Sequence, residues 1–147
     1  MALTPTLSTD VAHIIQLAVA PVFLLSGVGV TLTLFTNRLA RIVDRARILE
    51  DRLTADPPVD LHESLAVLAR RARYINYAIA LGTISGLLVT TTVILLFATA
   101  LLGNNMTLLI AVIFSAAMLT LTASLLVFFV EVRYATGNLR IGGRQRG

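Results

Sequence analysis

The positions of the charged residues constrain this chain more than any other feature. No Asp, Glu, Lys or Arg occurs between Asp10 and Arg38, and none occurs between Arg73 and Glu131. A helix rises about 1.5 Å per residue and a bilayer core is about 30 Å thick, so about 20 apolar residues make one crossing. The first stretch is long enough for one crossing and the second for two, with a break at Gly103-Asn104-Asn105. The sequence therefore predicts an all-α protein with three transmembrane helices.

The composition agrees with a single membrane domain over residues 1–147. With 56% hydrophobic residues in 147, the chain is too apolar for a soluble domain of this length. It contains no cysteine, which excludes disulfides, thiolate metal sites and cysteine nucleophiles.

The arginines predict the orientation of the chain. All 12 basic residues are arginine, and they lie either within residues 38–73 or after residue 132. An excess of arginine in short loops marks the cytoplasmic side of a membrane. We therefore expect a multi-pass protein of the bacterial cytoplasmic (inner) membrane, with its N-terminus outside and its C-terminus inside. Topology and anionic lipid account for basic residues that flank membrane spans, so we expect no nucleic-acid partner.

The apolar pattern predicts helices longer than the bilayer. Apolar residues recur at spacings of four and three after the first crossing, as in Phe35, Leu39 and Ile42, until Pro57-Pro58 interrupts the pattern. The pattern resumes at Leu61 and runs back into the membrane. We predict helices over residues 11–53, 60–102 and 106–133, followed by a flexible basic tail over 134–147. The first two helices would continue into a cytoplasmic antiparallel hairpin that packs like a coiled coil.

Four residues are predicted to take part in helix packing. Gly82 and Gly86 form a Gly-x-x-x-Gly pair, which lets two backbones approach closely, either in a homodimer or within one chain. Asn76 is expected to form an interhelical hydrogen bond, with Asn37 opposite. Glu131 is expected to neutralise one of four arginines, because an unpaired carboxylate at the membrane boundary is costly. The four candidate arginines are Arg38, Arg70, Arg71 and Arg73.

Three motifs resemble one known family. Residues 37–47 (NRLARIVDRAR) look like the signature of the membrane-protein family called domain of unknown function 2721. Residues 68–79 (LARRARYINYAI) and Glu131-Val132-Arg133 are similar to its later motifs, so that the resemblance extends from about residue 11 to residue 140. It implies a small bacterial membrane protein with the predicted topology, and it implies no catalytic or binding residues.

The sequence argues against an enzyme. The two histidines, His13 and His62, are expected at opposite ends of the protein, too far apart to share a metal or a proton. The sequence shows no catalytic triad, carboxylate pair, phosphate-binding loop or cluster of metal ligands. It also places no acid or base inside the hydrocarbon region, where proton-coupled pumps keep one. We expect no enzymatic activity, no cofactor and no metal.

A second face of the first helix suggests a function. It is small or polar through the membrane, interrupted by two leucines, and becomes basic beyond it. Its membrane part consists of His13, Gln16, Ala20, Leu24, Gly27, Thr31 and Leu34, and its cytoplasmic part of Arg38, Arg41, Arg45 and Arg52.

Two interpretations of this face remain open. It can pack on a neighbouring helix, since small residues are common at membrane helix interfaces. Alternatively, several copies can surround a pore with leucine constrictions and an arginine vestibule, in which no acid shares the arginine face. Our leading hypothesis is a homo-oligomeric channel for small ions that prefers anions. The alternative is a structural or signalling membrane module whose cytoplasmic hairpin binds a partner protein.

Overall fold

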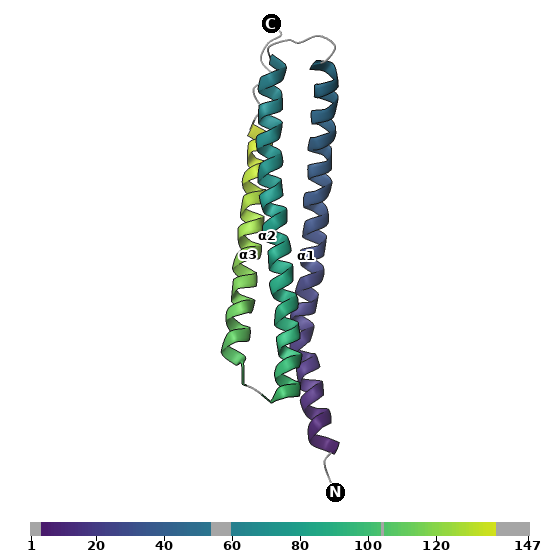
Figure 1. Cartoon of the computed structure of the whole chain (residues 1–147), viewed down its shortest axis with the longest axis vertical. Coiled ribbons are helices and arrows are strands. Elements are labelled where there is room, and N and C mark those ends of the chain that lie inside the picture. Colours follow the sequence, from purple (N-terminus) through teal and green to yellow (C-terminus); the bar gives the residue numbers. More distant parts are fainter. Residues whose placement is uncertain (1–3, 54–59, 104, 138–147) are drawn as a thin grey trace. The chain divides into compact units, whose positions relative to one another are not determined.

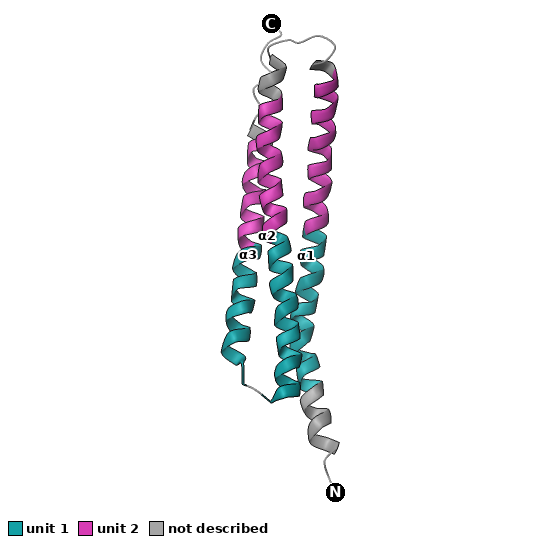
Figure 2. Cartoon of the chain, in the orientation of Figure 1, with its two compact units in different colours: residues 1–31, 82–121 teal, residues 32–81, 122–147 magenta. Residues whose placement is uncertain are grey.

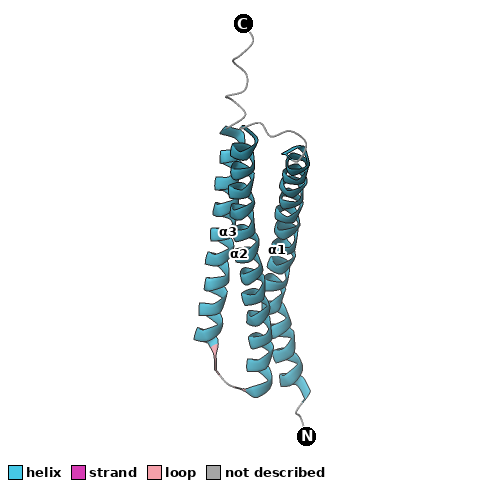
Figure 3. Ribbon diagram, turned by 45° about the horizontal axis from the view of Figure 1, so that its top comes forward, coloured by secondary structure: helices cyan, strands magenta, loops and turns pink. Residues whose placement is uncertain are grey.

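The computed structural model describes residues 4–53, 60–103 and 105–137, with side chains over 12–51, 65–103 and 105–134. It contains three helices, α1 (Thr4–Leu53), α2 (Asp60–Leu102) and α3 (Thr107–Gly137) (Figures 1 and 3). Each includes a segment that is long and apolar enough to cross a membrane, namely Ala12–Asp51, Leu65–Leu102 and Thr107–Tyr134. The predictions of an all-α fold and of three helices able to span a membrane are confirmed.

Two helix ends differ from the predicted ones. α1 begins at Thr4 rather than near residue 11, because Pro5 falls in the first turn, where a helix does not need the missing N–H. α3 continues past residue 133 to Gly137, since neither Ala135 nor Thr136 breaks a helix. The rest of the predicted tail, residues 138–147, lies outside the described residues, as do Pro57 and Pro58.

Gly103 ends α2. Its φ angle is +66°, a left-handed conformation that glycine adopts without steric cost, and its N–H donates to the Thr99 carbonyl at 3.0 Å. The sequence break at Gly103-Asn104-Asn105 therefore corresponds to a helix end with a physical cause.

The described chain divides into two units, each with its own packing (Figure 2). Unit 1 comprises residues 1–31 and 82–121. There a Cβ atom on Gly86 would lie 3.5 Å from Val28 Cγ1 and 3.8 Å from Leu25 Cδ1, so α2 approaches α1 closely at this glycine. The neighbouring Ser85 donates a hydrogen bond to the Ala117 carbonyl of α3 at 2.8 Å. Adjacent residues of α2 thus contact two different helices.

Unit 2 comprises residues 32–81 and 122–147. Its core contains Phe35 and Ile42 of α1 and Ile75 and Ala78 of α2. Six half-buried apolar residues surround these four: Leu39, Leu68, Ala72, Ile79, Val127 and Phe128. Phe35 also packs on the Phe128 ring of α3, with 4.4 Å between ring centroids. All three helices therefore contribute to this core.

Candidate functional site

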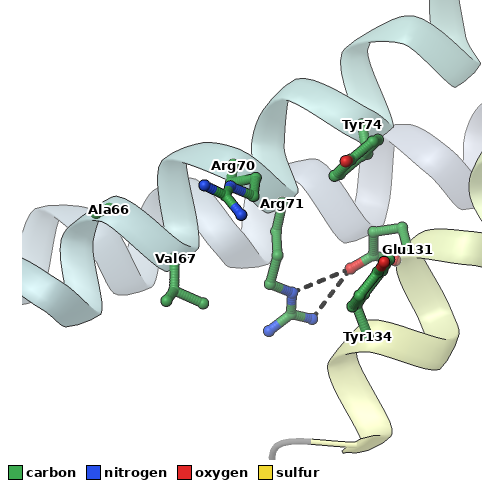
Figure 4. A pocket seen from close by; sticks show the side chains of 7 residues that line it. All are labelled: Ala66, Val67, Arg70, Arg71, Tyr74, Glu131 and Tyr134. Carbon is green, nitrogen blue, oxygen red and sulfur yellow. Dashed lines mark hydrogen bonds and ion pairs between the residues drawn. The ribbon is translucent and has the colours of Figure 1, made fainter.

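The charged centre of unit 2 consists of three residues, one from each helix, which we call the Glu131 triad. Glu131 of α3 is fully buried. Its Oε2 accepts a hydrogen bond from Arg38 of α1 at 2.9 Å. Its Oε1 accepts two from Arg71 of α2, at 3.0 Å from Nη2 and 3.2 Å from Nε. Figure 4 shows Arg71 reaching from α2 to this carboxylate.

The core packing of unit 2 explains why these residues meet. Arg38 follows the buried Phe35 by three positions, so it lies about one turn further along nearly the same side of α1. Arg71 precedes the buried Ile75 by four positions and lies similarly on α2. Glu131 follows Phe128, a ring packed against the core, by three positions. Burying these apolar side chains therefore turns all three charged groups toward one another.

The triad contains more positive than negative charge. Both carboxylate oxygens are occupied by guanidinium donors, which offsets the cost of removing the carboxylate from water. The Arg38 guanidinium also lies 5.2 Å from the centroid of the Phe128 ring, within cation–π range. Two arginines and one carboxylate leave the triad with a formal charge of +1, so it is suited to attract an anion.

Two pockets adjoin the triad and share Arg71 and Glu131. One has a volume of about 370 Å³ and lies along α2 and α3, lined by Ala66, Val67, Arg70, Arg71, Tyr74, Glu131 and Tyr134 (Figure 4). The other has a volume of about 490 Å³ and is lined by Arg38, Arg41, Ile42, Asp44, Arg45, Leu68, Arg71 and Glu131. Arginine predominates among the charged residues of both. Within the described part of the chain, no three His, Cys, Asp or Glu side chains gather in a way that could hold a metal ion.

Comparison with known proteins gives one finding. A family model described as Protein of unknown function (DUF2721) matches residues 18–141. The chain belongs to the DUF2721 family. The resemblance found in residues 37–47, 68–79 and 131–133 is thereby confirmed. No curated protein and no solved structure matches this DUF2721 chain significantly.

The arginine stripe of this DUF2721 protein differs from the expectation in one respect. We expected no acid on the arginine face of the first helix, and we expected Glu131 to neutralise one of four arginines. Glu131, which comes from the third helix, pairs with two of these four, Arg38 and Arg71, so the stripe has an acid beside Arg38. Arg41 and Arg45 are exposed, and the side chain of Arg52 lies outside the described residues.

The part of the same α1 face that is predicted to lie in the membrane consists mostly of exposed residues. Leu24 and Thr31 are half-buried at its edge, and the Thr31 hydroxyl donates to the Gly27 carbonyl at 2.9 Å. A Cβ atom on Gly27 would meet nothing within 4 Å. The remaining candidates are exposed in their own units: His13, Gln16, Ala20 and Gly27 in unit 1, and Leu34 in unit 2.

The residues assigned to helix packing have mixed outcomes. Gly82 and Gly86 are buried, and the contact of Gly86 with α1 shows packing within one chain. Asn76 and Asn37 are both exposed, and no hydrogen bond between these two described residues is present. The adjacent Ile75 takes the inward position, which turns Asn76 outward, so an interhelical hydrogen bond of Asn76 stays a prediction.

Sequence reasoning missed three contacts of α3. Ser124 donates to the Ala78 carbonyl at 2.6 Å, Ser85 donates to Ala117, and the rings of Tyr74 and Tyr134 stack with centroids 6.4 Å apart. One spacing in the sequence could have indicated which face of α3 makes these contacts. The fully buried residues Ala117, Ser124 and Glu131 recur every seven positions, which is the spacing of one helix face.

We expect Glu131→Gln to destabilise the protein by roughly 3 kcal/mol, at the low end of the range for breaking a buried ion pair because the arginines are partly exposed. The neutral amide cannot offset the charge of both guanidinium groups. The measurement is thermal and denaturant unfolding in detergent. The control, Glu50→Gln, changes an exposed carboxylate of α1 and should shift stability by less than about 0.5 kcal/mol. Equal effects of the two substitutions would contradict a structural role for the triad.

Proposed function

We propose that this protein forms a homo-oligomeric membrane channel in which α1 lines the pore. The observation that carries the proposal is that unit 1 leaves His13, Gln16, Ala20 and Gly27 exposed on one side of α1. Polar side chains within a membrane-spanning helix are costly against lipid and usually face other helices or a water-filled space. The other helices of the unit do not cover this side, so further copies of the chain are the available partner.

Another side of α1 in unit 1 exposes large apolar side chains instead of small and polar ones. Phe23 is 75% exposed and Val30 is 64% exposed, and these large apolar side chains suit contact with lipid. The small and polar face lies between this lipid-facing surface and the buried seam that contains Ala18, Pro21 and Val28. A separate surface next to the packed one is what a subunit needs in order to contact its neighbours in a ring.

The exposed arginines support a preference for anions. Arg41 and Arg45 of unit 2 line the pocket of about 490 Å³, where they outnumber the exposed carboxylate of Asp44. Rings of like charge concentrate counter-ions and exclude co-ions in a narrow passage. Arg38 contributes less than the sequence suggested, since Glu131 offsets its charge.

A conducting role fits the described side chains better than catalysis. Glu131 is the buried acid among the described residues, and guanidinium groups occupy both of its oxygens. It is therefore not free to act as a general acid or base.

We further propose that the N-terminus lies outside and the C-terminus inside the cytoplasmic membrane of a bacterium, with α1 and α2 continuing into the cytoplasm as a helical hairpin. The support is the arginine distribution, since the arginines lie on one side of the predicted spans.

The orientation can be tested with single cysteines, because the chain contains none. Asn105 and Glu50 are both exposed. We expect a membrane-impermeant thiol reagent to label Asn105→Cys in intact cells, and to label Glu50→Cys only after the membrane is opened. The reverse pattern would overturn the orientation.

Assembly can be tested by counting subunits with native mass spectrometry and cryo-electron microscopy. We expect a ring for the unmodified protein. Gly27→Leu should reduce or abolish it, because the new side chain fills the face that neighbouring subunits share. Gly29→Leu is the control, since Gly29 is equally open but lies about 200° around the helix. A monomeric unmodified protein would end the channel proposal and favour a module that docks a partner protein.

Ion selectivity tests the role of the arginines. In reconstituted bilayers with asymmetric salt, we expect reversal potentials that show anion preference. Arg41→Glu combined with Arg45→Glu should shift the preference toward cations, by about threefold in the local concentration of each ion and so by about sevenfold in their ratio for each kT of altered potential. Arg47→Glu, an exposed arginine on another side of α1, should have a smaller effect. Cation preference in the unmodified protein would contradict the proposal.

A further inference from the structure

We propose that the pocket between α2 and α3 binds the phosphate group of an anionic phospholipid. The pocket has a volume of about 370 Å³, within the range of roughly 300–1,000 Å³ that is typical of small-ligand sites. Its polar wall combines Arg70, Arg71, Tyr74 and Tyr134 (Figure 4). This site is separate from the α1 face that the channel proposal uses, so each can fail without the other.

The charge of the pocket favours an anion although a carboxylate lines it. The negative charge of Glu131 is already offset by Arg38 and Arg71, and the triad retains a formal charge of +1. Arg70 adds a second positive charge to the pocket, and it forms no ion pair with a described side chain. The neighbouring pocket of about 490 Å³ is less suitable, because it is also lined by the exposed carboxylate of Asp44.

The donors of the pocket suit the oxygens of a phosphate. Arg71 uses Nε and Nη2 on Glu131, which leaves Nη1 available to a second anion, so one guanidinium can bridge the carboxylate and the phosphate. Arg70 is exposed and can offer a guanidinium fork, the geometry that pairs with phosphate by two parallel hydrogen bonds. The stacked Tyr74 and Tyr134 rings place two phenolic hydroxyls on the same wall.

The position of the pocket favours a lipid over a soluble phosphate. The uncharged, largely apolar sequence of α3 ends at Val130, and the next residues include Glu131 and Tyr134, both of which line the pocket. This is the depth at which tyrosine rings and lipid headgroups lie. The exposed Val130 lies four positions before Tyr134, on the same face of α3, and continues that face into the uncharged apolar segment. A headgroup phosphate can therefore meet the arginines while the acyl chains lie along this segment.

The test measures lipid binding to the full-length, delipidated protein by native mass spectrometry. We expect one tightly bound phosphatidylglycerol per chain and weaker binding of phosphatidylcholine, whose choline cation is repelled by the arginines. Arg70→Gln should weaken phosphatidylglycerol binding about tenfold, as expected for the loss of a charge-assisted hydrogen bond. Tyr134→Phe, which removes only the hydroxyl, should weaken it less. Arg73→Gln is the matched control, since Arg73 is an exposed arginine of the same helix that does not line the pocket.

Each outcome decides the proposal. Equal losses for Arg70→Gln and Arg73→Gln would show general attraction to a basic surface and would overturn the site. Absence of selectivity for phosphatidylglycerol over phosphatidylcholine would do the same. A parallel arm uses inorganic phosphate and glycerol 3-phosphate as competitors. Displacement of the lipid by either at an equal concentration would keep the phosphate site but overturn the lipid as its occupant. Unchanged thermal unfolding of Arg70→Gln would confirm that its effect is on binding.

Discussion

Glu131 has no exposed surface, and each of its oxygens accepts a hydrogen bond from a guanidinium group on a different helix. A buried carboxylate is stable only when cations and donors replace its lost hydration. Because Arg38 comes from α1 and Arg71 from α2, meeting this requirement fixes the register of all three helices in unit 2. Removing either arginine would leave a buried charge only partly compensated, so the triad specifies the packing as well as stabilising it.

Weaker polar contacts have a similar effect on α2 and α3. Lipid does not drive apolar helices together, so close packing and interhelical hydrogen bonds determine how such helices associate. In unit 1 Ser85 donates to the Ala117 carbonyl, and in unit 2 Ser124 donates to the Ala78 carbonyl. Each bond joins a small side chain to a backbone group, which requires the two helices to be close. These contacts hold α2 and α3 in a defined register within each unit.

The triad also separates two possible functional surfaces. By pairing with Arg38, Glu131 offsets the charge of that arginine, and among the described side chains of the stripe Arg41 and Arg45 keep theirs without an ion-pair partner. By using only two nitrogens of Arg71, it leaves the third for a ligand between α2 and α3. The proposed assembly through α1 and the proposed anion site beside α3 therefore involve different residues, and substitutions can address them separately.

The sequence by itself determined the number and type of the elements. The cost of charge in hydrocarbon and the break at Gly103 act locally, so three helices with nearly correct bounds followed from residue order alone. Only the tertiary structure decided which arginines Glu131 contacts, that Gly86 faces Val28, and that Asn76 points outward. Four arginines near the ends of the uncharged stretches were candidate partners of Glu131. A periodicity identifies the buried face of a helix, but it does not identify the helix that packs against this face. That choice depends on how each helix is rotated and shifted against the others, which is set by the combined packing of Phe35, Ile75 and Phe128 rather than by any one segment.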